Sequence, residues 1–133
     1  MKKPITPYTH GVLDHATNLM VAAAPRLMRF PKRARRVTYG VAGGLAALAM
    51  LTDYPLAAKR AIPFKAHGLS DATLALALPA IPWLLGFARH RRARNFFLGL
   101  TAVTVAASLL TDWNKKSERV ARRRHKRRPR LAA

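Results

Sequence analysis

The sequence contains no cysteine and very few acidic residues. Without cysteine, disulfides and thiolate metal sites are excluded. Only 5 Asp and Glu residues stand against 25 Lys and Arg residues, which gives a formal net charge of +20. The sequence also lacks a nucleophile with a paired base, a glycine-rich phosphate loop and any cofactor motif. We therefore predict that the protein is not an enzyme and uses no cofactor.

Charged and apolar residues are separated along the chain. Lys and Arg gather at 26–36, 89–94 and 115–130, and runs without any charge lie between these clusters. Three such runs have about 16–17 residues, which as helix would span about 25 Å, the short end of a membrane crossing. The sequence therefore predicts four transmembrane helices, near 10–28, 37–54, 67–87 and 95–113.

A soluble four-helix bundle is the competing interpretation. Each of its helices would need a polar stripe that faces water. The segments 74–87 and 96–110 offer no such stripe, because Thr and Ser are their only small polar residues and these can bond to the helix backbone. A chain of 133 residues cannot bury several such helices on all sides. The pattern favours an all-α membrane protein.

The chain also reads as two tandem copies of one unit. When the sequence is aligned with itself at an offset of 57 residues, His10 and Asp14 match His67 and Asp71. After a two-residue insertion the offset becomes 59, and the Leu-Thr-Asp at 51–53 matches the Leu-Thr-Asp at 110–112. Each copy holds two predicted helices, so each is a helical hairpin. We expect a membrane domain over 1–113, with repeat 1 at about 8–56 and repeat 2 at about 65–113, and a basic, disordered tail over 114–133.

Several short stretches resemble a known family of membrane proteins. They are Pro82-Trp83-Leu84-Leu85-Gly86-Phe87 with the equivalent Pro25 and Phe30, the openings at 9–14 and 62–68, and the Leu-Thr-Asp-Tyr close of repeat 1. Over residues 8–113 the chain resembles the SPW-repeat proteins, whose unit is a helical hairpin with Ser-Pro-Trp in its first helix. This chain has Ile-Pro-Trp in one copy and Ala-Pro-Arg in the other. The resemblance implies a bacterial inner-membrane protein and no established chemistry.

Four of the five acidic residues and two of the five histidines fall in repeat pairs. His10 and Asp14 are four residues apart, on one face of a helix, and His67 and Asp71 match them. The starts of helices one and three and the ends of helices two and four lie at one membrane face. The sequence thus predicts a polar cluster there of His10, Asp14, Asp53, His67, Asp71 and Asp112.

Three interpretations of this cluster stay open. In the structural interpretation, Asp14 and Asp71 accept N–H bonds at helix starts, while Asp53 and Asp112 pair with histidines or loop cations. His10, His67, Asp14 and Asp71 can hold a divalent metal ion, for which His and carboxylate are suitable ligands. A row of ionisable groups can also form a proton or ion path, since such groups mark routes through membranes.

The remaining predictions concern the surroundings of the domain. Ten Lys and Arg residues between Lys115 and Arg130 favour contact with anionic lipid headgroups over nucleic acid, because no aromatic residues are interleaved with them. Exporting so basic a tail is unfavourable, so we expect cytoplasmic termini, with dual topology as the alternative. Gly and Ala faces on the helices permit a homo-oligomer. The aromatic residues expected at the membrane interface are Tyr54, Trp83, Phe87 and Trp113.

These patterns lead to one expected function and one alternative. We expect a non-enzymatic polytopic membrane protein that organises the bilayer or assists another membrane protein. The alternative is transport of a proton, an ion or a metal through the His/Asp cluster.

Overall fold

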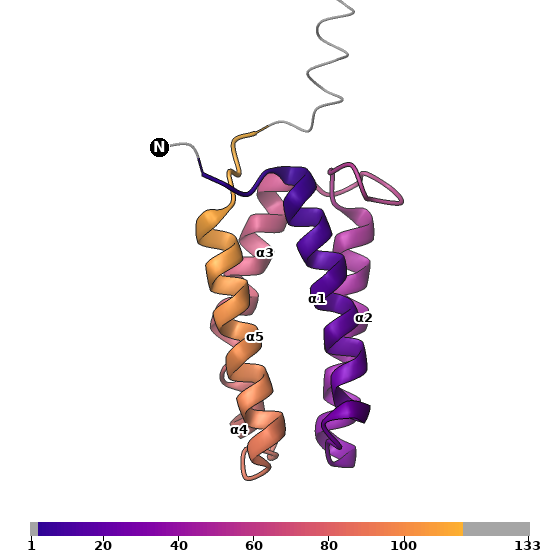
Figure 1. Cartoon of the computed structure of the whole chain (residues 1–133), viewed down its shortest axis with the longest axis vertical. Helices are drawn as coiled ribbons and strands as arrows, with labels where there is room; N and C mark the ends of the chain where they lie inside the picture. Colours follow the sequence, from indigo (N-terminus) through magenta and orange to yellow (C-terminus); the bar gives the residue numbers. More distant parts are fainter. Residues whose placement is uncertain (1–2, 116–133) are drawn as a thin grey trace, which may run out of the picture.

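Five α-helices make up most of the chain. In the computed structural model, which describes residues 3–115, they are α1 (Pro7–Leu27), α2 (Lys32–Leu51), α3 (Phe64–Ala77), α4 (Ile81–Leu84) and α5 (Arg91–Leu110). The described residues form no strand beyond two isolated bridges. Figure 1 shows the four long helices as roughly parallel columns, with α4 at the end opposite the N-terminus. The predicted all-α class is confirmed. The predicted tail lies outside the described residues, except for Asn114 and Lys115.

Helix ends follow the local sequence. Thr6 caps α1, because its hydroxyl accepts a hydrogen bond from the Thr9 backbone N–H, and Pro7 is suited to the first helical position. At the other end of the molecule, the Nδ1 atom of His90 accepts a hydrogen bond from the Ala93 N–H and caps α5 in the same way. Each cap fixes where the following helix begins.

The predicted third helix is divided, which corrects the expectation of one continuous segment over 67–87. α3 ends at Ala77, and the chain passes through a tight turn before the four-residue α4. Pro79 explains the break, since proline has no N–H for the helical ladder and its ring crowds the preceding turn. The next two donors bond only three residues back, Ala80 to Ala77 and Ile81 to Leu78. The described chain therefore has five helices where four were predicted.

The helices are paired into two hairpins. α1 packs along α2 and α3 packs along α5, while the contacts between the hairpins are sparser. An apolar core fills the middle and the loop end, with Val21, Leu78 and Phe97 almost fully buried. A second, aromatic group around Tyr54 and Phe64 closes the end where the N-terminus lies.

Short extended segments connect the hairpins at this end. Ile5, ahead of α1, bonds to the backbone of Leu110 and Asp112 at the end of α5. Ile62, ahead of α3, bonds in the same way to Leu51 and Asp53 at the end of α2. Each hairpin thus starts against the last residues of the other, and the helix ends are held at one level.

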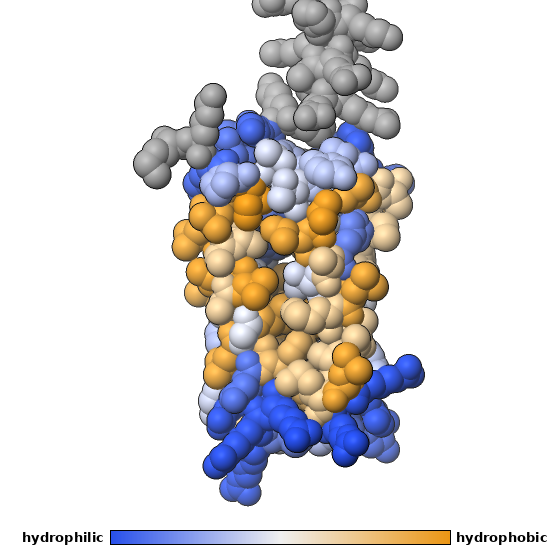
Figure 2. Space-filling view, viewed as in Figure 1, coloured by the Kyte–Doolittle hydropathy of each residue, from blue (hydrophilic) through white to orange (hydrophobic). Residues whose placement is uncertain are grey.

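The outer surface carries many exposed apolar side chains. Leu19, Leu76 and Leu109 are more than 60% exposed, and Figure 2 shows an apolar belt between two polar ends. Among the described helices, α5 alone is long and apolar enough to cross a membrane. α2 begins with four cations in its first five residues and is therefore too polar to meet this criterion, and α3 is too short because it has only 14 residues.

Candidate functional site

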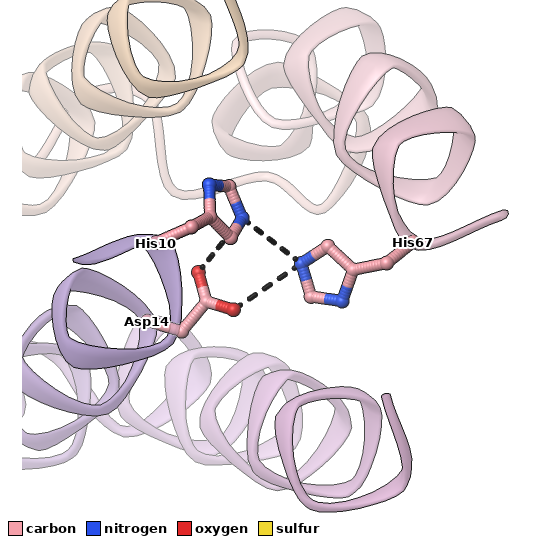
Figure 3. A group of neighbouring side chains, drawn as sticks. All are labelled: His10, Asp14 and His67. Atoms are coloured by element: carbon pink, nitrogen blue, oxygen red, sulfur yellow. Dashed lines mark hydrogen bonds and ion pairs between the residues drawn. The ribbon is translucent and has the colours of Figure 1, made fainter. Parts of the chain in front are cut away.

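Two histidines meet between the hairpins near the N-terminal end of the bundle. His10 lies in the first turns of α1 and His67 in the first turns of α3, and both are at most 2% exposed. Their Nε2 atoms are 3.3 Å apart. Figure 3 shows that the two rings point toward each other and toward the carboxylate of Asp14. The repeat pair is therefore brought together.

Two carboxylates flank the imidazole pair. Asp14 and Asp71 lie one helical turn after His10 and His67, so each shares a helix face with its own histidine. Each carboxylate also reaches the histidine of the other hairpin. The four Nε2–oxygen distances lie between 3.2 and 3.4 Å. These four residues of the predicted cluster thus lie together, with the carboxylates facing the histidines and not the backbone N–H groups expected for them, and the carboxylates bridge the hairpins.

Two threonines orient the histidines from behind. The Nδ1 atom of His10 is 2.8 Å from the hydroxyl of Thr111, and that of His67 is 2.7 Å from the hydroxyl of Thr52. Both threonines are fully buried at the C-terminal ends of α5 and α2. Each pair joins a histidine of one hairpin to a threonine of the other.

These hydrogen bonds determine which nitrogen of each ring carries the proton. Each threonine hydroxyl lies 2.6 Å from the backbone carbonyl oxygen four residues earlier, to which it donates its single proton. It must then accept from the histidine, so Nδ1 is the protonated nitrogen. In a neutral imidazole the Nε2 atom carries a lone pair. Two nitrogen lone pairs and the oxygens of two carboxylates therefore face one another over 3.2–3.4 Å.

Such a group of acceptors repels itself unless a cation lies among them. Removing these groups from water strengthens the repulsion, because charges interact more strongly in the protein interior. The site can be satisfied by protons or by a metal ion. Ligand atoms of His10, Asp14 and His67 all lie within 4.8 Å of one another, which is suitable for holding one ion.

The two halves of the site differ at one aromatic position. Tyr54 follows α2 and donates a hydrogen bond from its hydroxyl to Asp14 over 3.2 Å. Burial raises the pKa of this hydroxyl, and the charge of Asp14 raises it further, so Tyr54 stays a donor. Trp113 occupies the matching position after α5 and donates to the Ser108 carbonyl instead. Asp14 thus has a hydrogen-bond donor that Asp71 lacks.

Glycines allow these aromatic rings to lie against the helices. A Cβ atom on Gly11 would be 2.8 Å from the ring of Tyr54, and one on Gly68 would be 2.9 Å from Trp113. Phe64 packs against Trp113, and both rings pack against the two histidines. The aromatic rings exclude water from one side of the cluster.

A small cavity lies on the other side of the cluster. It has a volume of about 80 Å³ and extends between all four long helices. Asp14, His67 and Asp71 line one end, and the remaining lining residues are apolar except for Thr17 and Thr104. The cluster is therefore placed between an aromatic layer and an apolar cavity.

Two predicted members of the cluster lie elsewhere. The Asp53 carboxylate pairs with Arg60 over 3.3 Å, and that of Asp112 accepts from the Asn114 N–H. The residues that enter the cluster are their neighbours, Thr52 and Thr111. The repeated Leu-Thr-Asp triplet contained this signal, since its threonine is repeated together with the aspartate on which the prediction was based.

The predicted interfacial aromatic residues divide into two groups. Tyr54 and Phe87 are buried within the bundle, so their rings pack against protein and do not face the surroundings. Trp83 is 57% exposed and Trp113 is half-buried. Tyr54 is needed beside Asp14 and Phe87 in the core, where their rings remove apolar area from water.

Comparison of the chain with protein-family models, with curated proteins and with solved structures found no match. The resemblance to the SPW-repeat proteins therefore stays a prediction.

Proposed function

We propose that this protein binds a divalent transition-metal ion between its two hairpins, as a multi-pass membrane protein with no catalytic activity. The observation that carries the proposal is the spacing of the four ligand groups. The separation of the two Nε2 atoms and the four shortest nitrogen–oxygen separations fall between 3.2 and 3.4 Å.

This spacing leaves room for an ion held by His10, His67 and one oxygen of Asp14. Each carboxylate presents one oxygen to His10 and the other to His67, so Asp71 would enter such a site by turning one oxygen toward the ion. In a tetrahedral site, two ligands are separated by about 1.63 times the metal–ligand distance, or about 3.3–3.4 Å for bonds of 2.0–2.1 Å. Direct hydrogen bonds between charged nitrogen and oxygen atoms are shorter, at about 2.7–2.9 Å. The distances thus suit ligands around an ion better than direct ion pairs.

The chemistry of the ligands agrees with their spacing. Two carboxylates balance the charge of a divalent cation, and two imidazoles complete a site of mixed nitrogen and oxygen ligands. Thr52 and Thr111 hold His10 and His67 by the nitrogen that does not bind the metal. Outer hydrogen bonds of this kind are usual around metal-bound histidine. Zn²⁺, Mn²⁺ and Fe²⁺ all accept such ligands.

The other two interpretations have less support. If both histidines were protonated on Nε2, two N–H donors would face each other across 3.3 Å, so the pair is suited to one Nε2 proton at most. One protonated histidine would leave a single positive charge between two carboxylates. A proton or ion path would need polar groups along the bundle, and the cavity next to the cluster has Thr17 and Thr104 as its only further polar lining residues. The geometry favours binding of an ion over its conduction.

Membrane placement is supported by the surface and by the matching halves. The apolar belt in Figure 2 surrounds the helices, and the cations of the helix-connecting loops lie at one end of it. Corresponding positions of the two halves make corresponding contacts, as Ile5 and Ile62 do. Both observations support four spans from two tandem hairpins in a bacterial inner membrane. We place the termini and the metal site on the cytoplasmic side.

Metal titration tests the binding site. The purified full-length protein in detergent is stripped with a chelator and titrated with Zn²⁺, Mn²⁺ or Co²⁺. We expect one ion per chain, and an affinity loss of more than about a hundredfold in His67→Gln, because a ligand matters more than the residues behind it. The control is His15→Gln, a substitution in the same part of α1 that should leave the metal affinity equal to that of the parent. Absence of stoichiometric metal, or equal loss in both variants, would overturn the proposal.

Membrane topology is tested separately, and the absence of native cysteine makes the labelling specific. Single cysteines replace Lys59, near the metal site, and Arg91, at the start of α5. An impermeant thiol reagent added to intact cells and to inverted vesicles should label Arg91→Cys from the periplasmic side and Lys59→Cys from the cytoplasmic side. Labelling of both from the same side would reject four spans, and labelling of each from both sides would indicate dual topology.

A further inference from the structure

The end opposite the metal site is strongly and uniformly basic. The segments 26–36 and 89–94 together hold ten Lys and Arg residues, and the sequence has no Asp or Glu at 15–52 or 72–111. Figure 2 shows these side chains below the apolar belt. Among the described residues, no carboxylate balances the charge of this end, which is therefore suited to binding anions.

The two loops at this end share one turn and then diverge. The Phe30 N–H bonds to Pro25, and at the equivalent position the Phe87 N–H bonds to Pro82. The residue ahead of each phenylalanine has a positive φ, 54° at Arg29 and 68° at Gly86. The second loop then contains two additional residues before the next helix, as the change of offset from 57 to 59 requires.

These differences accompany a pocket in the second hairpin. It has a volume of about 520 Å³ and is lined by Trp83, Gly86, Ala88, Arg89 and Arg94. Gly86 lacks the side chain that Arg29 carries in the first loop, and the inserted residues contribute Ala88 and Arg89. We propose that this pocket binds the phosphate group of an anionic phospholipid.

The charges of the pocket are suited to a phosphate. Arg89 and Arg94 present guanidinium groups, which bind phosphate oxygens through paired N–H donors. A third guanidinium is close by, because Nη1 of Arg33 lies 2.8 Å from the position of a Cβ atom on Gly86. Arg33 comes from α2, so a bound phosphate would join the two hairpins at the end far from the metal site.

The position of the pocket favours a lipid over free phosphate. Trp83 is 57% exposed, and on the same short helix Leu84 is 78% exposed. The pocket therefore lies at the border between the apolar belt and the basic end. Tryptophan is enriched at this depth of a bilayer, where a phospholipid has its phosphate group and the start of its acyl chains. A lipid would bring a phosphate to the arginines and apolar chains to Trp83 and Leu84.

Fluorescence of Trp83 reports on binding at the pocket. Trp113 is the only other tryptophan and is replaced by Phe in every protein used. The full-length protein in a neutral detergent is titrated with short-chain phosphatidylglycerol, short-chain phosphatidylcholine or inorganic phosphate. We expect a saturable change with phosphatidylglycerol, and a far weaker response to phosphatidylcholine and to inorganic phosphate.

A matched pair of double variants separates the pocket from general charge. Arg89→Gln with Arg94→Gln removes two pocket cations, and Arg35→Gln with Arg36→Gln removes two cations of the first hairpin that do not line it. We expect at least about a thirtyfold loss of phosphatidylglycerol affinity in the first pair, because this double variant loses two guanidinium groups that hydrogen-bond to the charged phosphate. The second pair should lose less than about threefold. Melting temperatures of both pairs confirm that each protein is folded.

Three results would overturn the inference. Equal losses in both pairs would mean that the lipid responds to net charge alone. An equal response to inorganic phosphate would replace the lipid by a free anion, and absence of any saturable response would mean that there is no site. None of these outcomes depends on metal binding, because the pocket shares no residue with the metal site.

Discussion

Replacing the two threonines behind the histidines tests the metal site most directly. Thr52→Val and Thr111→Val keep the shape and volume of the side chain and remove the hydroxyl that accepts from each histidine Nδ1. The proton on Nδ1 is then free to move to Nε2, the atom that must bind the metal. We expect each variant to fold and to bind the metal more weakly.

The expected size follows from the contacts that are lost. Partners behind metal-bound histidines contribute about 10–100-fold in affinity. Both histidines are almost fully buried, so the orphaned N–H also costs about 1–3 kcal/mol in the metal-free protein. The two threonines serve separate histidines in matching positions, so the two single variants should behave alike. The double variant should lose both contributions.

Competition with a coloured chelator measures this affinity in detergent, and Thr38→Val is the control. Thr38 is fully buried in α2 and donates to the carbonyl four residues earlier, as Thr52 does, but its hydroxyl lies far along the helix from the histidines. The Thr38→Val protein should differ from the parent in melting temperature but bind the metal with the same affinity. Parental affinity in both Thr52→Val and Thr111→Val would refute the assignment of the lone pairs and with it the metal site.

Three further predictions follow from the contacts of single residues. Asp14→Asn should weaken metal binding, measured by chelator competition, by more than the threonine variants do. Asp53→Asn should leave metal binding unchanged and lower the free energy of unfolding, measured by thermal melting, by less than about 1 kcal/mol, because its ion pair is partly exposed. Gly11→Ala should destabilise the fold by about 1–3 kcal/mol, because the new methyl group meets the ring of Tyr54. Gly99→Ala should not destabilise it, because no atom lies within 4 Å of the added Cβ. A higher melting temperature for Gly11→Ala than for the parent would contradict this prediction. The raised pKa of Tyr54 keeps its hydroxyl neutral in the folded protein at about pH 11, so Tyr54→Phe should not reduce the tyrosinate absorbance measured there. The parent should lose stability above about pH 10, because Tyr54 ionises at that pH only in the unfolded chain.

Helix content and the central pair of the site could be predicted from the sequence. His10 and Asp14 share a helix face because they are four residues apart, and the repeat implies the same for His67 and Asp71. Two hairpins in tandem bring the starts of their first helices to one end. These inferences need only the period of the helix and the order of the segments, both of which are local properties.

The extent of the third helix was harder to predict. Pro79 and Pro82 indicated a disturbance, but proline is also found in continuous, kinked helices when neighbouring groups satisfy the backbone. Here the ladder gives way to bonds between residues three apart, and α3 ends. Whether a proline bends or ends a helix depends on what packs against the turn, which the sequence does not show.

The tertiary structure alone decided which residue of each Leu-Thr-Asp triplet serves the site. Thr52 and Thr111 are the C-cap residues after α2 and α5, and their backbone is extended. Successive side chains of an extended segment point to opposite sides, so the threonine and the aspartate cannot both face the histidines. Backbone bonds to Ile62 and Ile5 hold these extended ends so that Thr52 and Thr111 point inward and Asp53 and Asp112 do not. The sequence determines which residues share a face of one helix, because that face depends on local periodicity. Which face meets another helix depends on rotation and offset between elements, and these are set by packing across the whole molecule.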